Sequence, residues 1–409
     1  MKTAILSVGT EILFGQIVNT NTVYLSQQMN MLGFDVMYHY TVGDNPKRVE
    51  EMIDLAFQDC DLILTTGGLG PTQDDLTKEV ACKALDDTLV MMDDVLEEIT
   101  KYFKTLGREM TENNKKQAIM PSRATVFHND AGTAPGFALE KDGKYIICMP
   151  GPPREMKRMF QKSVVPFLQS MIDGALYYRQ IRFFGIGESM LETQLLDLID
   201  NQTDPTLATY AKEGECSLRI ASKRATEEEA EHAVDEMLEK VKERVGHYIY
   251  SCDDEELAQV VADRLMEQGL TLSSAESCTG GMFASTMTDI PGISQCFDRG
   301  LVTYSNQAKM EELGVSAETL EKFGAVSEET ALEMVEGLKS VSGSDVCISV
   351  TGIAGPGGGS EEKPVGLVYI GFSYGDKKIC KKIQMRNVNR SWNRHYTLLC
   401  MLNVIYRNI

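Results

Sequence analysis

The sequence predicts an α/β protein built from two parallel-sheet domains joined by a small α+β connector. Three observations favour this fold class. The chain has 409 residues, which is more than one hydrophobic core usually organises. Strand-like and helix-like segments alternate in its first third and again after Asp254. Several strand-like segments end in glycine-rich turns, where ligands bind in sheets of this kind.

The first domain, residues 1–170, is predicted from a strand–helix–strand–helix–strand succession, which requires right-handed crossovers. Asn45 and Pro46 mark one helix start, because asparagine caps helices and proline fits their first position. The predicted strands are Thr3–Val8, Phe34–Tyr40, Asp61–Thr65 and Tyr145–Met149; the predicted helices are Asn21–Leu32, Pro46–Phe57 and one after Pro153.

The connector, residues 171–251, is predicted to contain two strands, Leu207–Ala211 and Ser217–Ala221, and the acidic amphipathic helix Thr226–Val245. No pattern in it indicates catalysis, and its acidic helix face is expected to be solvated.

The last domain, residues 252–409, resumes the alternation, so its predicted parallel strands bring the side chains that follow them to one sheet edge. Its predicted strands are Leu270–Ser274, Gly300–Tyr304, Asp345–Val350 and Val365–Tyr374, followed by one more strand and a final helix.

Composition excludes several classes of protein. Hydrophobic residues make up 43% and charged residues 24%, as in globular proteins. A net charge of −20 makes nucleic acid an unlikely partner, since an acidic surface repels phosphate. No apolar run approaches the roughly 20 residues of a membrane span. Ten cysteines without a CxxC pair, and a start that does not resemble a secretory leader, predict reduced thiols in a cytoplasmic protein.

Residues 377–409 depart from this acidity. They fit either a basic strand and helix face or a local anion site, and the sequence leaves both open. The segment has no acid and eight basic residues: Lys377, Lys378, Lys381, Lys382, Arg386, Arg390, Arg394 and Arg407.

The segment Ala275-Glu-Ser-Cys-Thr-Gly-Gly predicts a nucleophile on a strand-to-helix turn. A helix start offers free backbone N–H groups, and Gly280 and Gly281 let a substrate approach the backbone. Ser277 is the preferred nucleophile. Cys278 is its rival, but none of the five histidines is placed to activate it, and they fit no triad or zinc spacing.

Lys309 is predicted to be the base that a serine nucleophile needs. Ser305 is a plausible helix N-cap, which places Lys309 on the first helical turn after a strand. Burial beside positive charge lowers the pKa of a lysine towards neutrality. The alternative is an ordinary surface lysine. N–H groups around Thr279–Gly281 are candidates for an oxyanion hole.

The loop Thr351–Gly359 contains five glycines, so its backbone is predicted to surround an anion. The alternative is a flexible hairpin loop. The following Ser360-Glu-Glu-Lys matches the SxxK pattern of penicillin-recognising enzymes, which requires a helix. Pro364 and the preceding glycines disfavour a helix, so this pattern is not expected to be catalytic.

In the first domain, Gly9-Thr-Glu, Asn19-Thr-Asn and Thr66–Asp75 all follow predicted strands. Glycine-rich turns hold phosphates, and Glu11, Asp74 and Asp75 suit a divalent cation that bridges a pyrophosphate. The alternative is that the two aspartates only cap the next helix.

These segments resemble one family over essentially the whole chain. Val8-Gly-Thr-Glu-Ile, Gly15-Gln-Ile-Val-Asn-Thr-Asn and Thr66-Gly-Gly-Leu-Gly-Pro-Thr are similar to the molybdopterin-binding-like domain of the CinA (competence/damage-inducible) family. Tyr304-Ser-Asn-x-Ala-Lys and Thr351-Gly-Ile-Ala-Gly-Pro, with the Ser277 segment, resemble its C-terminal amidohydrolase domain, which also occurs alone as nicotinamide-nucleotide deamidase. The resemblance implies that the connector is KH-like.

For the last domain, the resemblance implies hydrolysis of nicotinamide mononucleotide to nicotinic acid mononucleotide and ammonia without a cofactor. Ser277 and Lys309 match the family's catalytic pair, with Tyr304 beside them. One departure is Val388-Asn-Arg, where many members have Gly-Asp-Arg, so any role of that acid is lost. The residues expected to bind the nucleotide and its phosphate are Thr279, Gly280, Gly281, Gly352, Gly355, Gly357, Arg390 and Arg394.

For the first domain, the resemblance implies cleavage of ADP-ribose to AMP and ribose 5-phosphate with a divalent cation bound by Glu11, Asp74 and Asp75. A homodimer is expected. The rival hypothesis is a non-enzymatic molybdopterin-binding, nucleotide-binding or competence-related interaction protein. The residues expected to bind ADP-ribose are Gly9, Thr10, Asn19, Asn21, Gly67, Gly68, Gly70 and Thr72.

Overall fold

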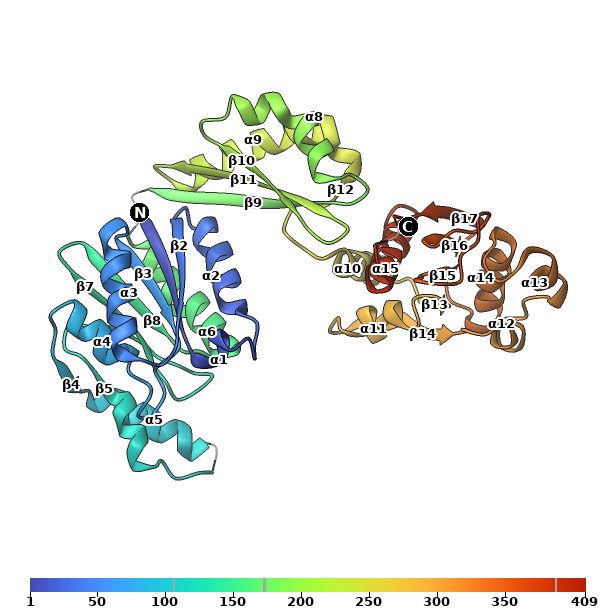
Figure 1. The fold of residues 1–409 in the computed structure, drawn as a ribbon. Coiled ribbons are helices and arrows are strands. Elements are labelled where there is room, and N and C mark those ends of the chain that lie inside the picture. The colour runs from blue at the N-terminus through green and yellow to red at the C-terminus, as the bar shows by residue number, and fades with distance from the viewer. Residues whose placement is uncertain (106, 172–173, 387) are drawn as a thin grey trace. The chain divides into compact units, whose positions relative to one another are not determined.

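The computed structural model in Figure 1 describes residues 1–105, 107–171, 174–386 and 388–409. The chain forms two compact units, Met1–Leu176 and Tyr177–Ile409, and the predicted α/β class is confirmed. Within the described ranges, no helix is both long and apolar enough to cross a membrane.

The N-terminal unit contains a six-stranded sheet in the order β2-β1-β3-β8-β7-β6. The first four strands pair in parallel, as predicted. The last two extend the sheet as antiparallel strands that the sequence analysis did not include. The strands are β1 (Lys2–Val8), β2 (Asp35–Val42), β3 (Leu62–Thr66), β6 (Thr125–Phe127), β7 (Gly136–Lys141) and β8 (Lys144–Met149).

Helices cover both faces of this sheet, so its central strands are apolar on both sides. In β1, Leu6 belongs to the core cluster that includes Ile53 of α3, while Ile5 belongs to the cluster that includes Leu25 of α2. The other elements of this unit are α1 (Thr10–Leu13), α2 (Thr20–Met31), α3 (Pro46–Asp59), α4 (Thr77–Ala84), β4 (Leu89–Met91), α5 (Asp93–Thr105), η1 (Glu112–Ala118), β5 (Ile119–Pro121), α6 (Pro153–Met159), η2 (Phe160–Val164) and α7 (Val165–Gln169).

The connector is a four-stranded antiparallel sheet in the order β10-β11-β9-β12, with α8 and α9 packed in its core cluster. The two predicted strands and the acidic helix correspond to β10, β11 and α9. Its elements are β9 (Ala175–Phe183), α8 (Glu188–Asp200), β10 (Thr206–Ala211), β11 (Cys216–Arg224), α9 (Glu227–Val245), η3 (Gly246–Tyr248) and β12 (Ile249–Ser251).

The C-terminal sheet has the order β14-β13-β15-β16-β17. β13 pairs in parallel with both β14 and β15, and the remaining pairs are antiparallel. The carboxyl ends of β13, β14 and β15 therefore meet at one edge. The elements are α10 (Leu257–Gln268), β13 (Leu272–Glu276), α11 (Met282–Thr288), η4 (Ile293–Gln295), β14 (Phe297–Val302), α12 (Asn306–Leu313), α13 (Ala317–Phe323), α14 (Glu328–Ser342), β15 (Val346–Gly352), β16 (Leu367–Tyr374), β17 (Lys377–Gln384) and α15 (Arg390–Tyr406).

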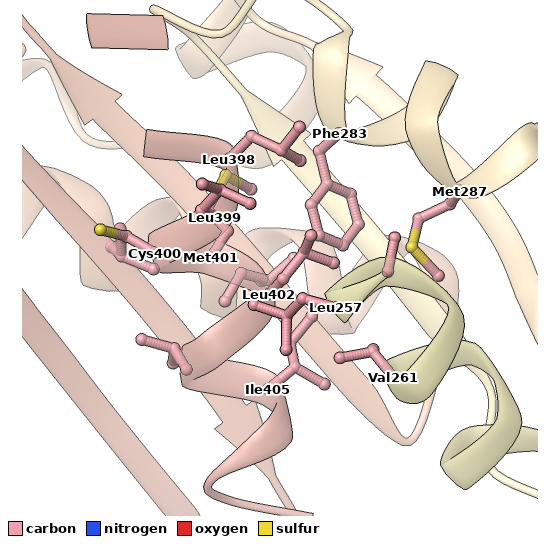
Figure 2. Close-up of a cluster of buried hydrophobic side chains, with 14 of the residues drawn as sticks. Leu257, Val261, Phe283, Met287, Leu398, Leu399, Cys400, Met401, Leu402 and Ile405 are labelled. Atoms are coloured by element: carbon pink, nitrogen blue, oxygen red, sulfur yellow. The ribbon is translucent and has the colours of Figure 1, made fainter. Parts of the chain in front are cut away.

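One face of this sheet is covered by α10, α11 and α15, whose apolar side chains pack against one another. Figure 2 shows Leu257 and Val261 of α10, Phe283 of α11, and Leu402 and Ile405 of α15 in this cluster. All five are almost completely buried. This packing fixes both α11 and the first turns of α15 against the strand ends that carry the predicted nucleophile.

Candidate functional site

Ser277 and Lys309 lie in direct contact at the edge formed by β13 and β14. The two atoms, Ser277 Oγ and Lys309 Nζ, are 3.1 Å apart. Ser305 caps α12 by accepting a hydrogen bond from the N–H of Ala308, so Lys309 leaves the first turn of that helix as predicted. Lys309 is 1% exposed and Ser277 is 8% exposed. The alternative of a surface lysine is therefore wrong.

The surroundings of Lys309 favour its neutral form. Burial lowers the pKa of Lys309, and among the described residues no carboxylate pairs with it. Nζ also donates hydrogen bonds to the carbonyl oxygens of Thr303 (2.8 Å) and Tyr304 (3.3 Å). A neutral amine keeps two N–H groups for these carbonyls, and its lone pair then accepts the Ser277 hydroxyl proton. This is the arrangement of a general base.

Cys278, the rival nucleophile, is placed unfavourably. Its side chain is 6% exposed and belongs to the hydrophobic core beneath the turn. Burial raises the pKa of Cys278 to about 12, so the thiolate is scarce near neutral pH.

Glu276 is a site residue that the sequence analysis missed. It is fully buried, and its two carboxylate oxygens accept hydrogen bonds from the N–H groups of Phe283 (3.0 Å) and Ala284 (2.9 Å). The expectation that the start of α11 offers these N–H groups to a ligand is therefore wrong. Glu276 instead binds the helix to the strand and fixes the turn that carries Ser277.

The glycine pair after Ser277 leaves one of its two N–H groups free for the predicted oxyanion hole, within the described part of the chain. Gly280 and Gly281 both have left-handed backbone conformations, with φ of 61° and 88°, which other residues adopt only with strain. The N–H of Gly280 donates to the carbonyl of Ser277 and is not free. The N–H of Gly281 has no acceptor in the described part of the chain.

Arg394 and Arg390 lie one turn apart on α15 and hold the loops around Ser277. Arg394 donates from Nε (3.2 Å) and Nη2 (2.6 Å) to the carbonyl of Thr279. Arg390 donates to the carbonyl of Gly355 (2.7 Å) and to the hydroxyl of Tyr304 (3.2 Å), whose side chain is 61% exposed. Each guanidinium thus uses two of its about five N–H donors on protein oxygens, and the predicted phosphate role would rest on the remaining N–H groups.

The glycine-rich loop follows β15, as predicted, but its glycines differ in role. Gly352 lies within β15, where a Cβ atom would be 2.8 Å from the carbonyl oxygen of Leu367. Gly355 has a left-handed φ of 82°, and only Gly357 has open space around it. Asn393 of α15, which the sequence analysis did not single out, donates to the carbonyl of Ala354 at 2.9 Å.

The structure also shows where two further sequence features lie: the SxxK pattern and the basic segment 377–409. Residues 360–363 form no helix, so the SxxK pattern is not catalytic, as expected. In the basic segment, the four lysines of β17 are exposed on the edge strand of the sheet, and Lys378 pairs with Glu336. Of the eight basic residues of this segment, Arg390 and Arg394 donate hydrogen bonds to the loops around Ser277. The lysines are therefore a basic strand face.

In the N-terminal unit, the loops after β1, β3 and β8 enclose a cavity of about 610 Å³. The predicted residues that line it are Gly9, Glu11, Gly67, Gly68, Gly70, Thr72, Asp74 and Asp75. Asp44, Gln117 and Glu155 also line it and were not predicted. Asn19 and Asn21 line a smaller adjoining cavity of about 50 Å³.

Many polar side chains around this cavity are engaged within the protein. Asn21 donates from Nδ2 to Thr66 Oγ1 (2.9 Å) and to the carbonyl of Gly151 (2.7 Å), which joins the loops after β3 and β8. Asn19 caps α2, and Thr10 donates to Asp44 from both its N–H and its hydroxyl. These residues shape the loops.

The glycines after β3 are required by the packing of the loop itself. A Cβ atom on Gly67 would lie 2.0 Å from the carbonyl oxygen of Val8, and one on Gly68 would lie 2.0 Å from Thr77 Oγ1. Both glycines also have left-handed φ angles, of 103° and 68°. These glycines are therefore explained by the close packing of β1, β3 and α4, before any role in ligand binding is considered.

The predicted metal ligands do not form a ready-made site. Asp75 Oδ2 already accepts hydrogen bonds from the N–H (2.9 Å) and hydroxyl (2.6 Å) of Thr72. Within the described ranges, no three acidic, histidine or cysteine side chains are grouped so as to hold a metal ion. Glu11 and Asp74 are exposed on the cavity wall. They fit a cation that shares its ligands with a phosphate, but not one held by protein alone.

Comparison with known families divides the chain into an N-terminal domain, a connector and a C-terminal domain. Family models match residues 4–170 ("Probable molybdopterin binding domain"), 178–251 (damage-inducible protein CinA KH domain) and 254–409 (CinA C-terminal domain).

Individual relatives match over the whole length. A CinA-like protein of Dictyoglomus thermophilum is 45% identical over 100% of this chain and 99% of its own. A CinA-like protein of Kosmotoga olearia is 47% identical over 94% of this chain and 93% of its own. Among solved structures, a competence/damage inducible protein of Agrobacterium tumefaciens is 43% identical and covers 37% of this chain and 92% of its own, with a TM-score of 0.36.

Proposed function

This chain belongs to the CinA family, and we propose that its C-terminal domain hydrolyses the carboxamide of nicotinamide mononucleotide to give nicotinic acid mononucleotide and ammonia. The observation that carries this proposal is the buried contact of 3.1 Å between Ser277 Oγ and Lys309 Nζ. A serine activated by an uncharged lysine suits acyl transfer, which an amide hydrolase performs.

In the proposed reaction, Ser277 Oγ forms a bond to the carboxamide carbon while its proton passes to Lys309 Nζ. The carbon–nitrogen bond then breaks, Lys309 returns the proton to the nitrogen, and ammonia leaves an ester on Ser277. Water then attacks this ester and gives one proton to Lys309. As the bond between the carbon and Ser277 Oγ breaks, Lys309 returns this proton to Oγ, which releases the acid and regenerates the serine hydroxyl. The N–H of Gly281 is a donor for the oxygen that becomes negative in each step.

The roles of the arginines follow from their contacts. Arg394 fixes the carbonyl of Thr279, so it orients the peptide groups beside the nucleophile. Arg390 links the glycine-rich loop to Tyr304. Both stand beside the loops at Ser277, where their remaining N–H groups could bind the 5′-phosphate.

The purified protein is expected to release ammonia from nicotinamide mononucleotide, and the rate should rise with pH. Lys309 accepts a proton only when neutral, and its pKa is lowered by burial, so the rate should level off below pH 10.5, the ordinary pKa of lysine. Ammonia release measured across pH, under conditions where the absence of a burst shows that the ammonia-releasing step limits the rate, checks this. A flat profile would contradict Lys309 as the base.

For the N-terminal domain we infer that its cavity binds ADP-ribose and cleaves the pyrophosphate when a divalent cation accompanies the substrate. The cavity of about 610 Å³ is large enough for a nucleotide-sized ligand, and two free carboxylates, Glu11 and Asp74, face it. The rival reading is a binding module without turnover, as the molybdopterin-binding family model also allows.

Two neighbouring variants separate these readings. Asp74→Asn should lower cation-dependent cleavage of ADP-ribose about tenfold or more with little loss of binding, since Asp74 would hold the cation that offsets the negative charge of the breaking pyrophosphate. Asp75→Asn should weaken binding, because its carboxylate braces Thr72. AMP formation and equilibrium binding with magnesium or EDTA measure both. Equal binding with and without the cation, and no cleavage, would leave only the binding module.

A further inference from the structure

A second cavity, of about 550 Å³, lies where the connector packs against the C-terminal domain. Both walls belong to one packed body, because Phe184 and Tyr250 of the connector are part of the hydrophobic core of the C-terminal domain. Gly214 lies directly against the ring of Tyr396: a Cβ atom on Gly214 would be 2.9 Å from Cδ2 of this ring. The Ser277–Lys309 pair does not line this cavity.

Aromatic side chains of α15 form one wall. The rings of Trp392 and Tyr396 are stacked, with centroids 5.0 Å apart and planes only 5° from parallel. Both side chains line the cavity and are half-buried. Such a pair offers a rigid, flat surface on which a heteroaromatic ring can stack, as bases do on aromatic side chains in nucleic-acid-binding proteins.

Charged side chains also line this cavity. The carboxyl group of Glu215 lies beside the Tyr250 hydroxyl, and its buried Oε1 can still accept a hydrogen bond from the amino group of a ligand. Lys212 and Arg386 line the same cavity, and within the described ranges neither side chain makes an ion pair or hydrogen bond. The charges of Lys212 and Arg386 therefore favour an anionic ligand group in the part of the cavity that these two side chains line.

The start of α8 also lines this cavity, but the carboxylate of its first residue, Glu188, already compensates the helix dipole. This helix has 13 residues, and its N-cap, Gly187, offers no side chain to satisfy the first N–H groups. Gly187 lines the cavity, so the positive end of the helix dipole faces it. Glu188 also lines the cavity, and its negative charge, like that of Glu215, excludes a phosphate from its own vicinity.

We propose that this cavity binds a nucleoside monophosphate. Its base stacks on Trp392, an exocyclic amino group donates to Glu215, and its phosphate contacts Lys212 and Arg386. The volume lies within the range of small-molecule sites, roughly 300–1,000 Å³. The proposal concerns a site distinct from the amidase and does not depend on the reaction proposed for Ser277.

The chain allows a direct test because Trp392 is its single tryptophan. Adenosine 5′-monophosphate is added to the full-length protein while tryptophan fluorescence is recorded. A saturable change is expected, with an apparent Kd in the micromolar to low millimolar range, and adenosine without phosphate should bind at least about tenfold more weakly. Equilibrium dialysis with labelled nucleotide gives the number of sites independently of fluorescence.

Lys212→Glu should raise the apparent Kd about tenfold or more and remove one bound nucleotide per chain, whereas Lys223→Glu should change neither. Lys223 is an exposed lysine of the same connector that does not line the cavity. Thermal unfolding of both variants checks that they are folded. No site filled below about 5 mM nucleotide, or equal binding by the two variants, would overturn the proposal.

Discussion

Replacing Ser277 with alanine is expected to abolish ammonia release from nicotinamide mononucleotide, by about three orders of magnitude or more in kcat. Without the hydroxyl no ester forms, and only binding and oxyanion contacts remain. The protein should stay folded, because the change removes one hydroxyl and one hydrogen bond to Lys309, worth about 1 kcal/mol. Ammonia assays and thermal unfolding of the purified variant measure the two effects separately.

Cys278→Ala is the matched control for this variant. The thiol is adjacent in sequence but lies in the core, and burial raises its pKa to about 12. We expect activity within a few-fold of the original and a loss of about 1 kcal/mol of stability from the small cavity. An inactive Cys278→Ala together with an active Ser277→Ala would show that the nucleophile is the cysteine.

Replacing Lys309 with arginine is expected to reduce deamidation about a thousandfold, although the positive charge is kept. A guanidinium stays protonated near neutral pH and cannot accept the serine proton. Because the site is 1% exposed, the larger arginine also has little room. Kinetic assays across pH should show no recovery at alkaline pH, where a lysine would have become neutral.

Lys309→Met removes the amine but keeps most of the length of the unbranched side chain, which separates chemistry from packing. It should be folded and equally inactive, while Lys322→Met, an exposed lysine on α13, should leave the rate unchanged. Retention of more than about a tenth of the rate in Lys309→Met would place the base elsewhere. A folded but inactive variant would assign the proton transfer to this amine.

The Ser277–Lys309 pair could be predicted because local patterns place both residues just after strands. Ser277 follows an apolar strand, and Lys309 follows a serine that caps a helix. Their contact also requires β13 and β14 to be neighbours, and this is a property of strand order that local sequence does not encode. The sequence therefore predicted the chemistry but left the distance open.

The structural contacts of three site residues were not predicted: one joins distant parts of the chain, and two are local contacts that no common sequence pattern describes. The basic charge of Arg394 suggested a phosphate ligand. In the structure, its guanidinium donates to the carbonyl of Thr279, which lies 115 residues away in the sequence. Glu276 caps a helix from the preceding strand, a direction that no capping pattern describes. The acidity of Asp75 suggested a metal ligand. In the structure, its carboxylate accepts a hydrogen bond from the N–H of Thr72.

The antiparallel strands at the edges of the sheets were harder to predict than the central strands. β6 has only three residues, and an edge strand lacks the continuous apolar run of a strand covered on both faces. The same holds for β12 of the connector. The central parallel strands were predicted to within two or three residues at most ends, because burial on both faces leaves a clear apolar signal.

The exposed lysines of β17 have a consequence for how copies of this chain can associate. β17 is the outer strand of its sheet, and such a strand offers unpaired backbone groups to a second sheet edge. Suppose two copies joined their β17 strands in antiparallel fashion, with Ile379 opposite Cys380 to match the apolar positions. Lys378 would then face Lys381 of the other copy, and Lys377 would face Lys382, so that every flanking pair repels. The lysines of this strand thus oppose sheet-to-sheet aggregation in the register that its apolar residues would otherwise favour.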